Sequence, residues 1–138
     1  MHSATIAQFN KQQPKTVFII DDNAMMRSMM RLGANEAELA VLGEAGTAQA
    51  GLARCAQLSP DIVLLDLGLP DGDGLELLSN IKAQAPGVFV IVVSGNNDQE
   101  VVRAAVSRGA LGFIVKPFSI GSITDTLVAA RRRLAARQ

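Results

Sequence analysis

The feature that most constrains the fold is a short apolar run that ends in an acidic residue and a turn. Residues 62–65 read Ile-Val-Leu-Leu, Asp66 follows directly, and residues 68–74 are mostly Gly, Pro and Asp. A run of this kind, bounded by turn residues, is typical of a strand buried on both faces of a parallel sheet. Asp66 is therefore predicted at the carboxyl end of a buried strand, where open α/β sheets bind their ligands.

Similar apolar runs recur along the chain and alternate with segments of helical character. We predict strands at residues 17–20, 39–43, 62–66, 88–93 and 111–115. Helices are predicted after each of them, at residues 24–37, 48–58, 74–83, from within 96–98 to about 108, and 120–135. Five strands alternating with five helices predict an α/β domain with a parallel sheet and helices on both faces.

Several polar residues and one glycine are predicted to delimit these helices. Thr47, Asp73 and Ser119 each precede a helix, and their side-chain oxygens can accept a hydrogen bond from its first turn. Gly109 follows the fourth helix and can adopt the left-handed conformation that ends many helices.

Composition and charge argue against several other classes of protein. The 13 Lys and Arg residues balance the 13 Asp and Glu residues, which gives no overall attraction to nucleic acid or anionic membrane. No apolar run approaches the roughly 18 residues of a membrane span. The single cysteine, Cys55, excludes an internal disulfide framework and fits a reducing compartment. We therefore expect a cytoplasmic protein.

The first residues differ from the rest of the chain. Residues 1–15 are polar, show no periodicity and lack the charged-then-apolar pattern of a secretory signal. We predict a flexible N-terminal tail at 1–15 and one domain at 16–138, with no output domain in this chain.

Four of the predicted strands end in polar residues that can do chemistry together. They are followed or ended by Asp21 and Asp22, Asp66, Ser94, and Lys116. Because the carboxyl ends of parallel strands lie at one edge of the sheet, these side chains are expected to converge. Any single Asp is as well explained by a helix cap or an exposed turn. Four polar strand ends together favour a site.

The chemistry of this set points to phosphoryl transfer. Three carboxylates repel one another unless positive charge joins them, and Lys116 supplies one charge. The remaining oxygen-rich site suits Mg²⁺. Aspartate is a nucleophile toward phosphoryl groups, and a metal, an ammonium and the hydroxyl of Ser94 can neutralise and orient the transferred group.

With these residues in place, the sequence resembles the receiver domain of two-component response regulators. The resemblance covers about residues 16–135 and rests on Asp21-Asp22, Asp66 with residues 69–72 (Leu-Pro-Asp-Gly), Ser94-Gly95, and residues 109–118 (GALGFIVKPF). It implies the flavodoxin-like, doubly wound fold with strand order 2-1-3-4-5.

The resemblance also implies roles for the acidic residues. Asp66 would accept a phosphoryl group from a phosphohistidine on a sensor histidine kinase or a histidine phosphotransfer protein. Asp22 and Asp66, with the backbone carbonyl of Gly68, would bind Mg²⁺, and Asp21 would act mainly through a metal-bound water.

The remaining site residues would serve the phosphoryl group. Ser94 would donate a hydrogen bond to it, and Lys116 would pair with it. The Lys116–Pro117 peptide bond is expected to be cis.

The sequence departs from the commonest family pattern near the site. Phe113 occupies the switch position, where tyrosine is more familiar, and the switch would therefore be a ring packing in or out together with Ser94. Gly68 offers no side chain, so we hypothesise that Asn96, rather than position 68, tunes the lifetime of the phosphoryl group. The alternatives are that Phe113 is an ordinary packed aromatic and that Asn96 only starts a helix.

Two features are predicted on the surface of the protein: a group of methionines on the first helix and a basic cluster on the last. Met25 and Met29 are predicted to be exposed beside the acidic site, where they could receive a phosphodonor, while Met26 and Met30 pack on the sheet. The basic cluster formed by Arg131–Arg133 and Arg137 is better explained by a solvated helix end than by nucleic-acid binding.

The function predicted from the sequence is a phosphorylatable receiver that switches its surface to control a downstream protein or output domain. It would assist its own phosphorylation and dephosphorylation without being an enzyme. Two rival functions remain: a Mg²⁺-dependent phosphatase with Asp66 as nucleophile, and an interaction module that is never phosphorylated. Against the phosphatase, Gly68 offers no second acid to protonate a leaving group.

Overall fold

The computed structural model describes residues 14–137, and these fold around one parallel sheet with the predicted strand order β2-β1-β3-β4-β5. All four pairs of neighbouring strands are parallel. The strands are β1 (Thr16–Ile20), β2 (Ala40–Ala45), β3 (Ile62–Asp66), β4 (Phe89–Ser94) and β5 (Ala110–Val115). The predicted tail lies outside the described residues except for Pro14 and Lys15.

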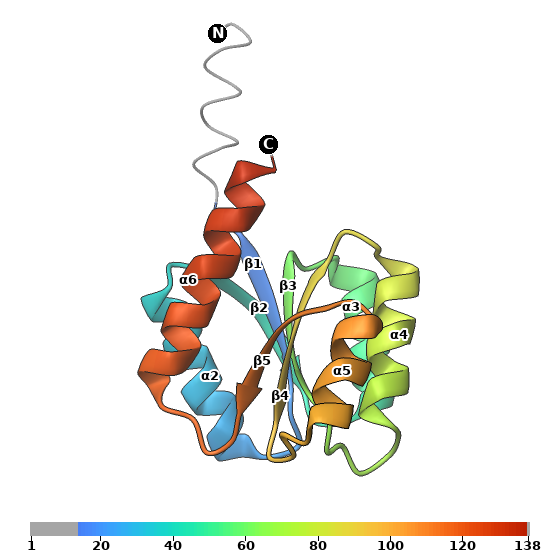
Figure 1. Ribbon diagram of the computed structural model, residues 1–138. Coiled ribbons are helices and arrows are strands. Elements are labelled where there is room, and N and C mark those ends of the chain that lie inside the picture. The colour runs from blue at the N-terminus through green and yellow to red at the C-terminus, as the bar shows by residue number, and fades with distance from the viewer. Residues whose placement is uncertain (1–13, 138) are drawn as a thin grey trace, which may run out of the picture.

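Helices cover both faces of the sheet, as predicted. α2 (Ala24–Glu36) and α6 (Ile120–Ala136) lie on one face, and α3 (Ala48–Leu58), α4 (Gly74–Gln84) and α5 (Gln99–Ser107) lie on the other (Figure 1). The loops that lead from strands into helices gather at one edge of the sheet, at the bottom of the view in Figure 1. None of the helices within residues 14–137 combines the length and apolar character that crossing a membrane requires.

Strict alternation along β1 divides the core into two halves. Val17 and Ile19 are fully buried in the half beneath α2 and α6. Phe18 and Ile20 are fully buried in the half beneath the other three helices. Because successive side chains of a strand point to opposite faces, a continuous apolar run is what a strand covered on both sides requires.

The largest difference from the predicted boundaries concerns the second strand. It was predicted at residues 39–43, but β2 runs from Ala40 to Ala45 and includes Glu44. Pairing with β1 extends it, because Gly43 and Glu44 lie opposite Phe18 and Ile19. Since β2 is an edge strand and mostly half-buried, it tolerates a glycine and a charge that ended the predicted run.

The predicted helix caps are confirmed. Thr47, Asp73 and Ser119 each accept a backbone hydrogen bond from the first turn of the helix that follows. Gly109 comes just after the C-terminal end of α5, and its φ of +103° lies in the left-handed region that favours glycine. The helix predicted to start within residues 96–98 begins at Gln99, and Asp98 precedes it without a side-chain cap.

Candidate functional site

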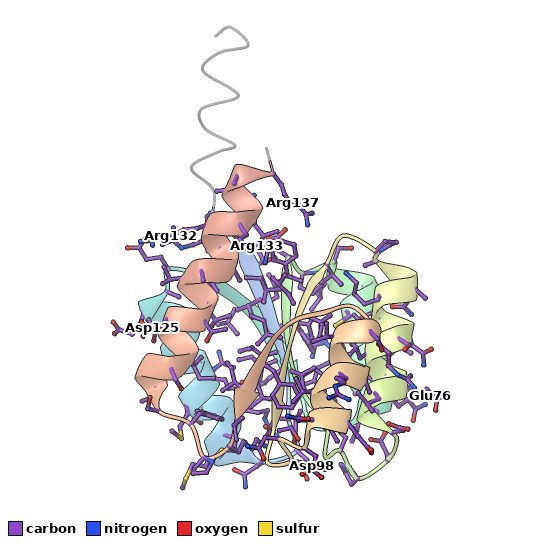
Figure 2. The ribbon with its side chains drawn as sticks, in the orientation of Figure 1. Glu76, Asp98, Asp125, Arg132, Arg133 and Arg137 are labelled. Carbon is purple, nitrogen blue, oxygen red and sulfur yellow. The ribbon has the colours of Figure 1, made fainter. Side chains whose placement is uncertain are left out.

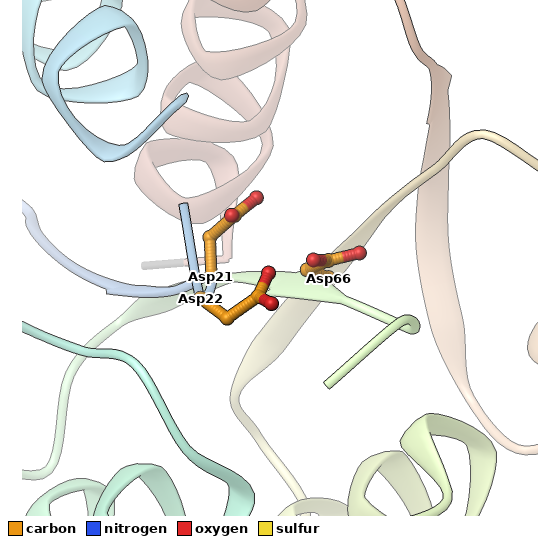
Figure 3. A group of neighbouring side chains, drawn as sticks. All are labelled: Asp21, Asp22 and Asp66. Atoms are coloured by element: carbon orange, nitrogen blue, oxygen red, sulfur yellow. The ribbon is translucent and has the colours of Figure 1, made fainter. Parts of the chain in front are cut away.

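Three carboxylates meet at the edge of the sheet where the strands end. Asp21 and Asp22 follow β1, and Asp66 is the last residue of the neighbouring strand β3 (Figure 3). One carboxylate oxygen from each of the three lies within 4.8 Å of the others. Asp21 and Asp66 are buried, whereas Asp22 is exposed to solvent. The acidic cluster predicted from the sequence is therefore present, with two members inside the protein and one at its surface.

Lys116 lies between the two buried carboxylates. Its Nζ is 3.0 Å from Oδ2 of Asp21 and 3.3 Å from Oδ2 of Asp66. The Lys116–Pro117 peptide bond is cis, as predicted. One ammonium is thus shared by two acids that come from different strands.

The charges and burial of this cluster shift two pKa values. Burial raises the pKa of Asp66, and repulsion by Asp21 raises it further, against the opposing effects of the Gly68 N–H and the Lys116 ammonium. Burial alone would lower the pKa of Lys116, but its hydrogen bond to Asp21 and the charges of both acids raise it. Lys116 is therefore held in its charged form, while the negative charge of Asp66 is only partly compensated.

Gly68 contacts Asp66 through its backbone. Its N–H donates to Oδ1 of Asp66 at 3.0 Å, and this bond orients the carboxylate. A Cβ at position 68 would meet only Oδ1 of Asp66, at 3.6 Å, and one at Gly95 would meet nothing within 4 Å. Both glycines therefore leave open space beside the acid.

Ser94 and Asn96 form a short network after β4. Ser94 is the buried last residue of β4, and its Oγ accepts the backbone N–H of Asn96 at 3.1 Å. Oδ1 of Asn96 accepts the N–H of Asp98 at 3.0 Å, just ahead of α5. The Asn96 side chain thus lies in the loop ahead of α5 and is hydrogen-bonded to the residue that precedes this helix.

Sequence reasoning missed two residues that support the acidic edge. Nη1 of Arg27 donates to the backbone carbonyl of Asp21 at 2.7 Å, and its Nε donates to Glu44 at 3.0 Å. Glu44 also pairs with Arg31, and these arginines lower its pKa although burial opposes them. The available signal was a pair of arginines, Arg27 and Arg31, that lie four residues apart on the same face of α2. The first turn of this helix has no acidic residue to pair with them.

The donor set fits Mg²⁺. Three carboxylates against one ammonium leave net negative charge, and their oxygens are the hard ligands that this ion prefers. The open backbone around Gly68 and the exposed Asp22 leave room for the water ligands that Mg²⁺ usually keeps.

Comparisons with known proteins decide the family. The family model described as "Response regulator receiver domain" matches residues 17–128. The chain is 34% identical to chemotaxis protein CheY of Listeria monocytogenes, and the match covers 84% of this chain and 98% of that protein. The chain belongs to the response regulator receiver domain family.

Two further comparisons concern a longer regulatory protein and a solved structure. It is 38% identical to the KDP operon transcriptional regulatory protein KdpE of Escherichia coli, across 87% of the chain but only 52% of that protein. The solved structure of the receiver domain of AraT from Geobacillus stearothermophilus superposes with a TM-score of 0.83 at 23% identity, covering 91% of this chain and 99% of that one. The last match shows that the fold is shared.

Other predicted residues of the receiver domain lie away from the acidic cluster. Phe113 is half-buried in β5 and packs against the core half beneath α3, α4 and α5. It also lines an open depression of about 510 Å³ together with Phe118, Ser119 and Thr126. The structure therefore places Phe113 at the surface near the start of α6.

Three of the four methionines of α2 lie as predicted. Met30 is fully buried and Met26 packs against the core, whereas Met25 is 68% exposed. Met29 was predicted to be exposed, but it is half-buried. Cys55 is buried, and burial raises the pKa of its thiol to about 11.

The basic cluster sits at the far end of α6, away from the edge that carries Asp98 (Figure 2). Arg133 and Arg137 lie over the ring of Phe89, at 5.9 Å and 4.7 Å from its centroid. Arg137 also donates to the carbonyl of Gly87 at 3.2 Å. These arginines attach the end of α6 to the start of β4, which gives them a role within the fold.

Proposed function

We propose that Asp66 is the phosphoacceptor of this receiver domain and takes a phosphoryl group from a phosphohistidine. The observation that carries the proposal is its position: a buried carboxylate ends β3, held by the Gly68 N–H and 3.3 Å from Lys116. An oxygen of Asp66 attacks phosphorus, the bond to the donor's imidazole nitrogen breaks, and the imidazole leaves with the electron pair. The product is an aspartyl-phosphate.

The roles of the neighbouring residues are those that the resemblance to the family implies. Asp22, Asp66 and the backbone carbonyl of Gly68 would bind Mg²⁺, and Asp21 would act through a metal-bound water. When bound, Mg²⁺ neutralises charge on the phosphoryl oxygens. Lys116 would move its ion pair from Asp66 to the phosphoryl group while it keeps Asp21 as a partner.

We propose a switch that starts at Ser94. Its hydroxyl would turn toward the phosphoryl group and donate a hydrogen bond, and the bond it accepts from Asn96 would be lost. Movement of the β4–α5 loop would let the Phe113 ring pack inward. The result is a shift between two pre-existing arrangements of the surface formed by α5, β5 and α6.

The lifetime of the phosphoryl group is assigned to Asn96. Gly68 has no side chain to shield the acid, whereas Asn96, two residues after Ser94, carries a polar side chain. We expect Asn96→Ala to change the rate of dephosphorylation severalfold, as followed by loss of the phosphorylated mass with time. Dephosphorylation at the wild-type rate would contradict this role.

The partners follow from the same assignment. The donor would be a sensor histidine kinase or a histidine phosphotransfer protein, docking beside Met25 and Met29 on α2 in the cytoplasm. A Met25→Ala/Met29→Ala double variant should accept the phosphoryl group more slowly from the donor protein but at the normal rate from acetyl phosphate. The output would be a downstream protein or an attached output domain.

We propose that the domain is not itself an enzyme. Receiver domains are generally non-catalytic signalling modules, although one relative, which this chain covers to 35% of its length, is named as a protein-glutamate methylesterase. Phosphate monoesters offered in excess should be hydrolysed no faster by this chain than by the buffer. Turnover of such esters would favour the phosphatase alternative.

Mass spectrometry tests the central proposal directly. After incubation with acetyl phosphate and Mg²⁺, the wild type should gain the mass of one phosphoryl group, and Asp66→Ala should gain none. Asp73→Ala is the matched control, because this exposed aspartate only caps α4. An unmodified wild type, or an Asp66→Ala variant that is still modified, would overturn the proposal.

A further inference from the structure

An aspartate outside the acidic cluster connects the loop after β3 to a different helix. One oxygen of the Asp71 carboxylate accepts the N–H of Ala48 at 2.7 Å, and the other accepts the N–H of Gln49 at 3.1 Å. Both donors belong to the first turn of α3, 22 and 23 residues earlier in the chain. These hydrogen bonds lower the pKa of Asp71, so that it stays charged at neutral pH.

Asp71 supplies the negative charge that the N-terminus of α3 lacks in its own sequence. Thr47 already caps this helix by accepting the N–H of Ala50. The first turn of α3 contains no acidic residue, although helix N-termini favour negative charge. Asp71 therefore completes the N-terminus of α3 from outside, and in return its own loop is attached to a rigid helix.

That loop carries the groups assigned to the metal. It runs from residue 67, directly after Asp66, to Asp73, which caps α4, and it includes Gly68. Gly68 is exposed and has no side chain, so packing of its own cannot hold its carbonyl in place. The carbonyl is held in place by the hydrogen bond of the Gly68 N–H to Asp66 and by the next anchors of the loop, which are the buried Leu69 and the tethered Asp71.

From this arrangement we propose that Asp71 is a positioning residue for the phosphoacceptor site. Its two hydrogen bonds to α3 hold the loop at residues 67–73, and thereby hold the Gly68 carbonyl where it binds Mg²⁺. The inference rests on the function proposed above for Asp66 and Gly68. It adds a residue that touches neither the metal nor the phosphoryl group.

The proposal is tested with Asp71→Ala, Asp71→Asn and a matched control, Thr47→Ala. The control removes a cap from the same helix end without touching the loop. Two measurements are made on each protein. Calorimetric titration with Mg²⁺ gives the dissociation constant, and amide hydrogen exchange of Gly68 is followed by NMR in the metal-free protein.

For Asp71→Ala we expect Mg²⁺ binding to weaken about threefold to tenfold, less than the roughly 10–100-fold typical of groups bonded directly to a metal ligand, because Asp71 acts through the loop. Exchange at Gly68 should become faster, and Asp71→Asn, which keeps one acceptor oxygen, should lie between it and the wild type. Thr47→Ala should change neither quantity. With saturating Mg²⁺, phosphorylation of Asp71→Ala by acetyl phosphate should remain within about twofold of the wild type, because its reacting groups are intact.

Other outcomes separate this inference from the proposed function. If wild type binds Mg²⁺ and Asp71→Ala binds it equally well, the positioning role is overturned and the function stands. If Thr47→Ala weakens Mg²⁺ binding as much as Asp71→Ala does, the effect comes from helix stability and the positioning role is again overturned. A wild type that binds no Mg²⁺ would overturn both.

Discussion

At the scale of single residues, the acidic cluster holds a buried charge that is not fully compensated. Asp66 shares Lys116 with Asp21, and its pKa is raised by burial and by the repulsion of Asp21. A raised pKa means that the folded protein binds the proton of Asp66 more tightly than the unfolded chain does. The contribution of this residue to stability is therefore present below the ordinary pKa of 3.8 and is lost as the pH rises through the folded value.

This leads to a prediction for Asp66→Asn. At about pH 7 without metal, the variant should be more stable than the wild type by about 1 kcal/mol, because a poorly compensated buried charge is removed. Thermal unfolding with and without Mg²⁺ measures the difference. Saturating Mg²⁺ should stabilise the wild type more than the variant, because it binds the native carboxylates. A variant less stable than the metal-free wild type would contradict this account.

The pKa of Glu44 is shifted in the direction opposite to that of Asp66. Arg31 and Arg27 lower its pKa, so its contribution to stability is present above the ordinary value of 4.5 and is lost as the pH falls through the lower, folded value. Its position at the end of an edge strand makes this a test of a partly exposed ion pair.

We predict that Glu44→Gln destabilises the protein by roughly 0.5–1 kcal/mol at about pH 7, as expected for such pairs. In urea unfolding the difference between the two proteins should shrink as the pH is lowered below 4.5, because the carboxyl is protonated first in the unfolded chain and then, at its lower pKa, in the folded protein. Arg31→Gln, which leaves the Arg27 contact, should lose only part of this stability. A pH-independent difference would point to packing instead of charge.

At the scale of elements, the turn from β3 into α4 depends on close backbone packing. Gly74 is the first residue of α4, and a Cβ on it would lie 2.4 Å from the Cα and 2.5 Å from the carbonyl oxygen of Leu67. Those are backbone atoms next to Asp66 and cannot move independently of the site. A glycine at this point is therefore required by space, without any unusual φ.

We predict that Gly74→Ala destabilises the protein by about 2 kcal/mol, within the usual range for overpacking. The melting temperature should fall by several degrees, roughly as expected for a domain of this size. Gly72→Ala is the control, because its Cβ would meet only the Cβ of Ala48, at 3.5 Å. Equal melting temperatures for the two variants would show that the loop adapts to the added methyl group.

At the scale of the whole molecule, the site and the proposed output surface share one sheet. Ser94 is the last residue of β4, Lys116 follows the neighbouring strand β5, and Phe113 lies in β5 three residues before the lysine. A change at the acidic edge can therefore reach the surface of α5, β5 and α6 through strand ends that are already in contact.

We predict that a phosphoryl mimic with Mg²⁺ changes NMR signals mainly in the β4–α5 loop, β5 and the start of α6. The ring of Phe113 should become more buried, whereas Phe89, beneath Arg137 at the other end of β4, should not change and serves as an internal control. An unmoved Phe113 ring would remove this residue from the switch.

Much of this protein follows from local sequence. The apolar run at residues 62–65, the acid after it and the caps Thr47, Asp73 and Ser119 are recognisable because strands and helix ends have short-range signatures. The convergence of Asp22, Asp66 and Lys116 was also predictable, because parallel strands end at one edge. The order of the strands came from resemblance to a family, since periodicity carries no information about which strands are neighbours.

Contacts between side chains of different elements could not be predicted from local patterns. The sharing of Lys116 by Asp21 and Asp66, the contact of Arg27 with the Asp21 carbonyl, and the attachment of Asp71 to α3 join residues that are distant in sequence or lie on different elements. Such contacts depend on strand order, helix placement and rotamers together, none of which a local pattern encodes. Local sequence is enough to place Asp66 at the end of a buried strand, whereas the way its carboxylate is held depends on residues that only the packed fold brings next to it.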